Sequence, residues 1–353
     1  MTAFKVTRIE GPEAWYGDEL AKDGRWRLRL EAADIAEIDA ALDGVRARAI
    51  PWSEMTKADF PLGGLAAKLD AVAEELENGT GLANLGGLPV ERYDDEALSH
   101  IWFGLALHLG TPLYQDYCGL LMRDITDERQ DTDAVLGHRF HARDGTVFHS
   151  SKARTASSGP LRFHTDRADV VGLLCIHQAA AGGISELASS VTVHNEILER
   201  RPDLAELLYG VIYRSKLGEE KRGGDEIYAL PVFGVRDGKF TSHYSRTYVE
   251  AAQEIEEVPR LSQAQWEALD LLAEVAEEIS MEMVLEPGDM QFINNHVVYH
   301  ARTAYEDPAA DGERRRLRRI WLAMPNSRAL PQDHAVLWRN VEAGAVRGGI
   351  GQA

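Results

Sequence analysis

The order of strand-like and helix-like runs is the feature that most constrains the fold of this chain. Short apolar runs separated by turns fill residues 110–183, and a second group of such runs follows residue 287. Between them, residues 189–208 and 261–280 have the apolar spacing of amphipathic helices. Strands on both sides of a helical insertion require distant segments to pair. We therefore expect a mainly β core with α elements, an α+β fold of the jelly-roll type.

The first third of the chain is expected to be helical. Amphipathic runs cover residues 31–50, 60–78 and 94–109, and Asp94 has the residue type and position of an N-cap. The glycine-rich apolar run at 81–90 suits a buried strand.

No linker, repeat or low-complexity block divides the sequence. We therefore expect one domain over residues 1–353. Its expected parts are a helical N-terminal flank (1–77), a catalytic core (78–325) and a C-terminal tail (326–353).

Charge and cysteine content exclude several classes of function. The 353 residues include 57 Asp and Glu against 38 Lys and Arg, a net charge of −19. A nucleic acid or an anionic membrane would require the opposite sign, so neither is an expected partner. Cys118 and Cys175 are too few for a disulfide framework or a four-cysteine metal site.

The N-terminal residues lack the apolar stretch of a signal peptide. No uncharged apolar run approaches the roughly 18 residues that a membrane helix needs. We expect a cytoplasmic protein that binds a small molecule, and the sequence leaves homo-oligomer formation open.

One histidine stands out among the twelve in the chain. His164 is followed two residues later by Asp166 in the strand-like run LRFHTD, and alternation along a strand places both on one face. An imidazole and a carboxylate are two of the three ligands in the facial triad that binds Fe(II). About one such pair is expected by chance in a chain of this composition, so a third ligand is needed. His300, in a later strand-like run, is the candidate.

Two arginines near the C-terminus are expected to face the interior. Arg315 and Arg319 are four residues apart, and apolar Leu317 and Trp321 share their face of the strand. A buried guanidinium requires an anion, and its planar fork matches a carboxylate. A ligand carboxylate would satisfy this requirement, and so would an internal Asp or Glu.

Four motifs occur together in the core. They are HTD from His164, GGIS from Gly182, PGDMQFINNHVVYHAR from Pro287 and RRLRRIWL from Arg315. Their combination resembles the TauD/TfdA (taurine dioxygenase, clavaminate-synthase-like) family of Fe(II)- and 2-oxoglutarate-dependent oxygenases over about residues 78–325. The resemblance implies a double-stranded β-helix, the cupin-like form of the jelly roll.

The resemblance also implies which residues bind iron. These would be His164, Asp166 and His300. His296 has the same alternation as His300, but the family pattern of Asn-Asn, then a histidine shortly before a small residue and an arginine, selects His300. No catalytic residue beyond the iron site is expected.

The cosubstrate site is implied in the same way. Arg319 would bind the distal carboxylate of 2-oxoglutarate, with Arg315 as an accessory. Ser185 occupies the place of the threonine that the family usually has, and its hydroxyl would keep the contact.

The implied activity is hydroxylation of an unactivated C–H bond by O2, with 2-oxoglutarate converted to succinate and CO2. Asp166 disfavours halogenation, because halogenating relatives have a small residue at this position. A small, carboxylate-bearing or amino-acid-like metabolite is the expected substrate class. Its expected partners are Lys152 and Arg154, in a locally basic stretch, and Arg246.

Two other functions remain as alternatives at this point. One is a cupin-type metal hydrolase or isomerase, which would use the same three ligands without 2-oxoglutarate. The other is a jelly-roll binding module with structural histidines and no catalytic activity.

Overall fold

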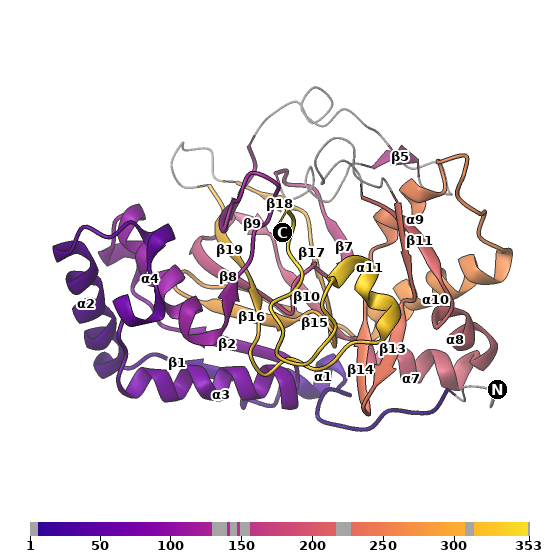
Figure 1. Cartoon of the computed structure of the whole chain (residues 1–353), viewed down its shortest axis with the longest axis horizontal. Helices are drawn as coiled ribbons and strands as arrows, with labels where there is room; N and C mark the ends of the chain where they lie inside the picture. Colours follow the sequence, from indigo (N-terminus) through magenta and orange to yellow (C-terminus); the bar gives the residue numbers. More distant parts are fainter. Residues whose placement is uncertain are drawn as a thin grey trace.

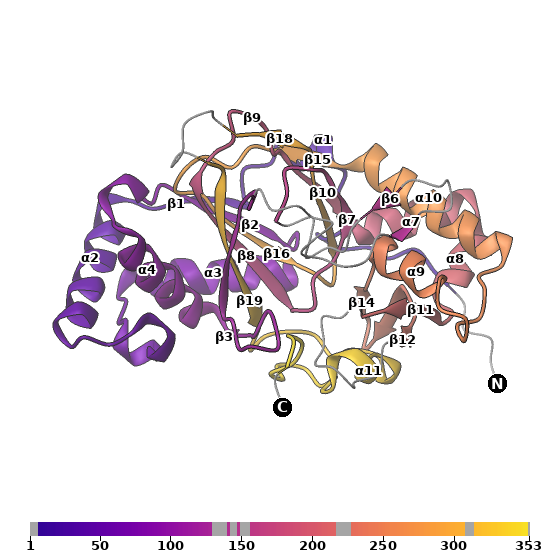
Figure 2. The ribbon, with the colours of Figure 1, turned by 90° about the horizontal axis from the view of Figure 1, so that it is seen from above.

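The computed structural model describes residues 6–128, 140–141, 147–148, 156–216, 227–307 and 314–351. Two antiparallel-rich sheets form its centre (Figures 1 and 2). The large sheet has the order β1 (Arg27–Arg29), β2 (Leu82–Gly86), β16 (Met290–Asn294), β8 (Val170–His177), β19 (Arg316–Ala323) and β3 (Thr111–Pro112), and β4 (Met122–Ile125) also pairs with β19. The small sheet has the order β15 (Met281–Met283), β10 (Ser185–Ser189), β17 (Val298–Arg302) and β7 (Leu161–His164).

Each sheet joins strands from distant parts of the sequence. β8 lies between β16 and β19, and β17 pairs with both β10 and β7. One apolar cluster contains residues from both sheets, among them Val171, Ile293 and Leu187. The predicted jelly-roll core closed by distant segments is therefore confirmed.

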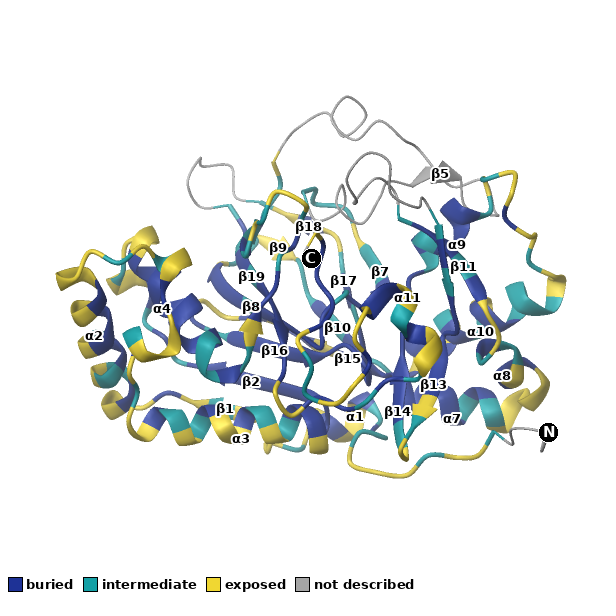
Figure 3. Ribbon diagram, in the orientation of Figure 1, coloured by how far each residue is buried: buried dark blue, intermediate teal, exposed yellow. Residues whose placement is uncertain are grey.

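Helices cover the outer face of the large sheet. The helices are α2 (Ala32–Ala47), α3 (Gly64–Asn78) and α4 (Asp95–Leu109). Figure 3 shows exposed residues on the outward side of α2 and α3 and buried residues toward the sheet. The expected cap is present, since the Asp94 carboxylate accepts a hydrogen bond of 2.7 Å from the amide of Ala97.

The helical insertion covers the small sheet. It contains α7 (Ser190–Arg200), α8 (Pro202–Leu208), α9 (Arg246–Ala252) and α10 (Gln263–Ile279). α7 and α10 both contact β10. The remaining elements are α1 (Gly17–Leu20), α11 (Ala335–Trp338), the short 3-10 helices at Trp52–Glu54, Lys57–Asp59, Val90–Arg92 and Gln332–His334, and the strand pairs β11 (Ile212–Ser215) with β12 (Ile227–Leu230), β13 (Phe233–Arg236) with β14 (Lys239–Ser242), β9 (Ala181–Gly182) with β18 (Tyr305–Glu306), and β5 (Phe140–His141) with β6 (Val147–Phe148).

The N-terminal flank is not helical throughout. β1 lies within it and pairs in parallel with β2 at the edge of the large sheet. Its three residues are too short to give a strand pattern in the sequence. Among the described residues, no helix combines the length and the apolar character that a membrane crossing requires.

Candidate metal centre

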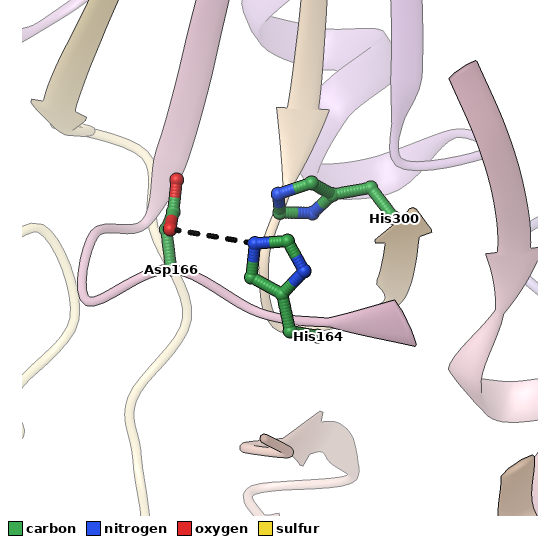
Figure 4. Close-up of side chains that lie close together, drawn as sticks. All are labelled: His164, Asp166 and His300. Carbon is green, nitrogen blue, oxygen red and sulfur yellow. Dashed lines mark ion pairs between the residues drawn. The ribbon is translucent and has the colours of Figure 1, made fainter. Parts of the chain in front are cut away.

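Three side chains converge between the two sheets. His164 is the last residue of β7, and its Cα pairs with that of His300 on β17. The potential ligand atoms of His164, Asp166 and His300 all lie within 4.8 Å of one another. In Figure 4 the two rings and the carboxylate point toward one common space. His164 Nε2 lies 3.9 Å from Asp166 Oδ1, and the imidazole centroids are 4.2 Å apart.

The reason that His164 and Asp166 meet differs from the sequence-based expectation. β7 ends at His164, so strand alternation does not extend to Asp166. The chain turns after His164, and the Asn295 side chain accepts a hydrogen bond of 2.9 Å from the Asp166 amide. The position of Asp166 therefore depends on the connection between β16 and β17.

Hydrogen bonds orient two of the three candidate ligands. His164 Nδ1 lies 2.9 Å from the carbonyl oxygen of Arg162, so this nitrogen carries the proton and Nε2 retains a lone pair. Asp166 Oδ2 accepts a hydrogen bond of 2.8 Å from the Trp321 indole and lies 3.7 Å from Nη1 of Arg319. These contacts leave Oδ1, the oxygen nearer His164, available to an ion.

The electrostatic surroundings keep the three groups in metal-binding protonation states. Burial lowers the pKa of His164, and it lowers the pKa of His300 to about 3, so both rings are neutral at pH 7. Burial opposes ionisation of Asp166, but the surrounding groups, with the charged Arg319 guanidinium first and the Trp321 indole among them, outweigh it and hold the pKa of Asp166 below its ordinary value.

The donor set fits a divalent transition metal. Two neutral imidazoles and one carboxylate on one side of an ion form the facial arrangement preferred by Fe(II), which leaves three positions open. The Nδ1 atom of His300 is buried and has no hydrogen-bond partner among the described residues, so none of them competes for this nitrogen. His296 is excluded from this set, because its ring nitrogens contact Asp169 and Thr241 at 2.8 Å each.

A small cavity of about 50 Å³ adjoins the three ligands and receives all three expected cosubstrate residues. Ser185, Arg315 and Arg319 line it together with His164, Asp166 and His300. Arg315 is 4% exposed, and its Nη1 atom is buried without a hydrogen-bond partner. Its guanidinium lies 5.0 Å from the centre of the Tyr305 ring, and its Nη2 donates to the carbonyl of Gly183 at 3.3 Å.

Arg319 is placed differently from Arg315. Its Nε donates a hydrogen bond of 2.7 Å to Gln115 Oε1, and its guanidinium stacks at 4.7 Å from the Trp321 ring centre. Together with its contact to Asp166, this places Arg319 beside the metal ligands. Arg315 therefore retains a buried donor that no described residue engages, whereas the resemblance implied the leading role for Arg319.

A second small cavity, of about 60 Å³, is also lined by His164 and Asp166. Residues absent from the sequence-based candidates line it, including Gln115, Arg123, Arg167, Tyr248 and Ile350. They come from separate segments, and no local motif marks them.

Of the expected substrate residues the structure describes only Arg246, which lines neither small cavity. Lys152 and Arg154 lie outside the described residues. Arg246 forms ion pairs with Glu250 at 2.8 Å and Asp270 at 2.7 Å, and it lines a separate open cavity of about 870 Å³ whose lining contains none of the three candidate ligands. This placement gives no support to a substrate role for Arg246.

Comparisons with known proteins identify the family of this chain. Residues 49–321 match the family described as "Taurine catabolism dioxygenase TauD, TfdA family". FR-33289 synthase from Streptomyces rubellomurinus is 28% identical over 337 residues, which cover 92% of each protein. The taurine hydroxylase-like protein SAT17 from Stachybotrys chartarum is 28% identical over 89% of this chain and 79% of that protein.

Solved structures share the fold. An asparagine oxygenase in complex with Fe(II), 2S,3S-3-hydroxyasparagine and succinate has a TM-score of 0.64 at 17% identity, covering 91% of this chain and all of that one. The non-heme iron oxygenase OrfP with Fe and α-ketoglutaric acid has a TM-score of 0.60 at 17% identity, covering 84% and 93%. Because the family match spans most of the sequence, the expectation is confirmed: the chain belongs to the TauD, TfdA family of dioxygenases.

Proposed function

We propose that the protein is an Fe(II)- and 2-oxoglutarate-dependent dioxygenase that hydroxylates a small, carboxylate-bearing or amino-acid-like molecule. The observation that carries the proposal is the cavity that joins His164, Asp166 and His300 to the partly unsatisfied guanidinium of Arg315. A metal hydrolase would not require a buried arginine there, and a binding module would not require the three converging ligands.

In this proposal His164 Nε2, Asp166 Oδ1 and one ring nitrogen of His300 hold the iron. Fe(II) chelated by 2-oxoglutarate supplies oxidation of an unactivated C–H bond by O2, with release of succinate and CO2. The Arg162 carbonyl fixes the His164 ring, and Trp321 fixes the Asp166 carboxylate. These contacts orient the ligands before any ion binds, which reduces the reorganisation that binding requires.

Arg315 is the proposed partner of the distal carboxylate of 2-oxoglutarate, with the Ser185 hydroxyl beside it. A buried guanidinium with a free N–H is a strong site for a carboxylate. Arg319 is already engaged by Gln115 and Asp166, so we assign it to the metal side of the pocket. This division reverses the order of importance that the sequence suggested.

The proposed substrate position is the cavity of about 60 Å³ next to Asp166. Its lining includes the cationic side chains Arg123 and Arg167, which suit a carboxylate, and Gln115 and Tyr248, which supply hydrogen-bonding groups. The family relative in complex with hydroxyasparagine supports an amino-acid-like substrate as the first class to test.

The test is an anaerobic titration of metal-free protein with Fe(II) and then 2-oxoglutarate, followed through the weak visible charge-transfer band of the chelate. We expect the band to grow to one equivalent and to disappear in His300→Ala and Asp166→Ala. His177→Ala, at an exposed position at the end of β8, is the matched control and should retain the band. Arg315→Ala should weaken 2-oxoglutarate binding by roughly 10–100-fold, more than Arg319→Ala does, because it removes a hydrogen bond to a charged group.

Absence of the band in folded wild-type protein would overturn the proposed function. If the band forms, succinate release is measured with a panel of small amino acids and carboxylates. Stimulation by an amino acid supports the substrate class, whereas stimulation only by neutral compounds contradicts it.

A further inference from the structure

Gln291 is a polar residue on the inner face of the large sheet. It lies on β16, where it pairs with Leu173 of β8 and Asn84 of β2. Strand alternation turns Gln291 and Ile293 toward the space between the sheets, and Phe292 toward the helices. Gln291 is 1% exposed, so its amide must find its partners inside the protein.

The hydrogen bonding of the Gln291 amide is incomplete. Its nitrogen lies 3.2 Å from Sδ of Met283, and a thioether is only a weak acceptor. Its Oε1 atom is buried and has no hydrogen-bond partner in the part of the chain that the structure describes. The oxygen and nitrogen of an amide are assigned from their surroundings, and here the protein alone does not satisfy either orientation.

The unsatisfied oxygen of Gln291 is one of several unsatisfied polar atoms around the same cavity. Gln291, Arg315 and His300 line the same cavity, and each has a buried polar atom without a hydrogen-bond partner. Ser185, which is also buried, lines that cavity too. A cavity in which several polar groups lack partners is completed by a polar ligand. The proposed ligand has a carboxylate, which accepts hydrogen bonds and would require the NH2 group of Gln291, not its oxygen, to face it.

We infer that Gln291 presents its amide NH2 to this cavity and is a further binding residue for the distal carboxylate of 2-oxoglutarate, beside Arg315 and Ser185. This inference rests on the proposed function and adds a selectivity role to it. The amide donor distinguishes a 2-oxo diacid from a 2-oxo monoacid, because only the diacid has an acceptor at that end. The hydrogen bond to the distal carboxylate also satisfies the buried amide. Gln291 therefore contributes nothing to the affinity for a ligand that lacks this carboxylate.

The test compares two ligands in two proteins. Gln291→Met replaces the amide by an apolar side chain of similar length and volume. Affinities of the Fe(II)-loaded protein for 2-oxoglutarate and for 2-oxopentanoate, which lacks the distal carboxylate, are measured anaerobically by the charge-transfer band. We expect Gln291→Met to weaken 2-oxoglutarate binding about tenfold or more, as for a lost hydrogen bond to a charged group, and to leave 2-oxopentanoate binding within about twofold.

Two further variants keep the result interpretable. Gln178→Met makes the same chemical change at a residue that does not line this cavity, where the amide donates to the Leu285 carbonyl, and it should change neither affinity. Gln291→Glu keeps the shape of the side chain, and its negative charge should weaken 2-oxoglutarate binding more than Gln291→Met does.

Different results would overturn the proposed function and the proposed role of Gln291. If wild-type protein gives no band with Fe(II) and 2-oxoglutarate, the proposed function fails. If wild-type protein gives the band, and folded Gln291→Met binds 2-oxoglutarate as tightly or loses both ligands equally, the role of Gln291 is overturned while the proposed function stands.

Discussion

At the scale of single residues, Asp166 shows how the orientation of one candidate ligand depends on its neighbours. Its backbone amide donates a hydrogen bond to Asn295, and its Oδ2 atom accepts one from the Trp321 indole. The nearby guanidinium of Arg319 stabilises its negative charge. Trp321 and Arg319 lie on β19, and Asn295 lies in the connection between β16 and β17. The carboxylate is thereby held in one orientation, and metal affinity should depend on residues that do not contact the ion.

Trp321→Phe tests this dependence. The change keeps an aromatic ring but removes the N–H that donates to Asp166 Oδ2 at 2.8 Å. We expect Fe(II) affinity to fall about tenfold or more, as measured by anaerobic titration. Trp52→Phe, at a partly exposed position that does not line either small cavity, is the control and should bind Fe(II) normally. Unchanged affinity in folded Trp321→Phe would show that the indole does not orient the ligand.

At the scale of elements, β19 places the arginines of one charged run on two faces with different surroundings. From sequence alone this run resembles a solvated basic strand. Arg318, on the outward face, pairs with Asp124 at 2.8 Å and donates to Ser99 at 2.8 Å. Arg316, on the same face, pairs with Asp124 at 2.6 Å. The inward face carries Arg319 and, just before the strand, Arg315. Alternation therefore divides one charge run into a structural ion-pair network and the proposed cosubstrate site.

The turn before β10 supports the same site from the opposite sheet. Gly183 has φ of +68°, a left-handed backbone conformation that residues other than glycine rarely adopt. A Cβ atom there would lie 2.7 Å from Nε of Arg315. The turn thus leaves space for the guanidinium and provides the carbonyl to which it donates.

Gly183→Ala should therefore affect both stability and cosubstrate binding. We expect a loss of about 1–2 kcal/mol in unfolding free energy from the left-handed backbone and weaker 2-oxoglutarate binding from displacement of Arg315. Gly238→Ala is the matched control, because Gly238 has φ of +77° and no atom within 4 Å of the added Cβ. It should lose similar stability in a urea titration and keep its 2-oxoglutarate affinity. Equal affinities in the two variants would contradict the link between the turn and Arg315.

At the scale of the whole molecule, the C-terminal segment joins the metal site to the rest of the core. Arg347 donates a hydrogen bond of 2.8 Å to Asp169, three residues after the candidate ligand Asp166, and both side chains are fully buried. The Gly349 amide donates to the Arg167 carbonyl at 2.7 Å, which brings Ile350 to the proposed substrate cavity. Figure 2 shows this yellow segment passing along the side of the sheets.

Arg347→Ala tests how strongly this segment is held. Removing Arg347 takes the cationic partner from the buried Asp169 carboxylate, which keeps its contacts with His296 and the Met324 amide, so we expect a loss of about 3 kcal/mol in unfolding free energy. Arg92→Ala breaks an exposed pair with Asp39 and should cost at most about 1 kcal/mol. Equal losses in urea titrations of the two variants would show that the C-terminal segment contributes little to stability.

The features predicted from sequence are those that local patterns determine. Amphipathic spacing and the Asp94 cap predicted the helices α2, α3 and α4 close to their observed bounds. Strand-length runs predicted the jelly-roll core, and joint motifs predicted the family, which the comparison confirms. The same motifs selected His164, Asp166 and His300, which the structure brings together; their roles as ligands stay predictions.

What only the tertiary structure decided depends on residues far apart in the chain. The Asn295 contact that positions Asp166 spans 129 residues, and the Trp321 contact spans 155. The division between Arg315 and Arg319 follows from which neighbours already engage each guanidinium, and alternation alone gives both the same face. No local sequence pattern marks Gln291 as a binding residue. What marks it is a buried amide oxygen without a hydrogen-bond partner among the described residues, which only the folded core shows. Sequence periodicity predicts which face of a strand a residue occupies. The groups that it contacts on that face depend on how distant segments pack.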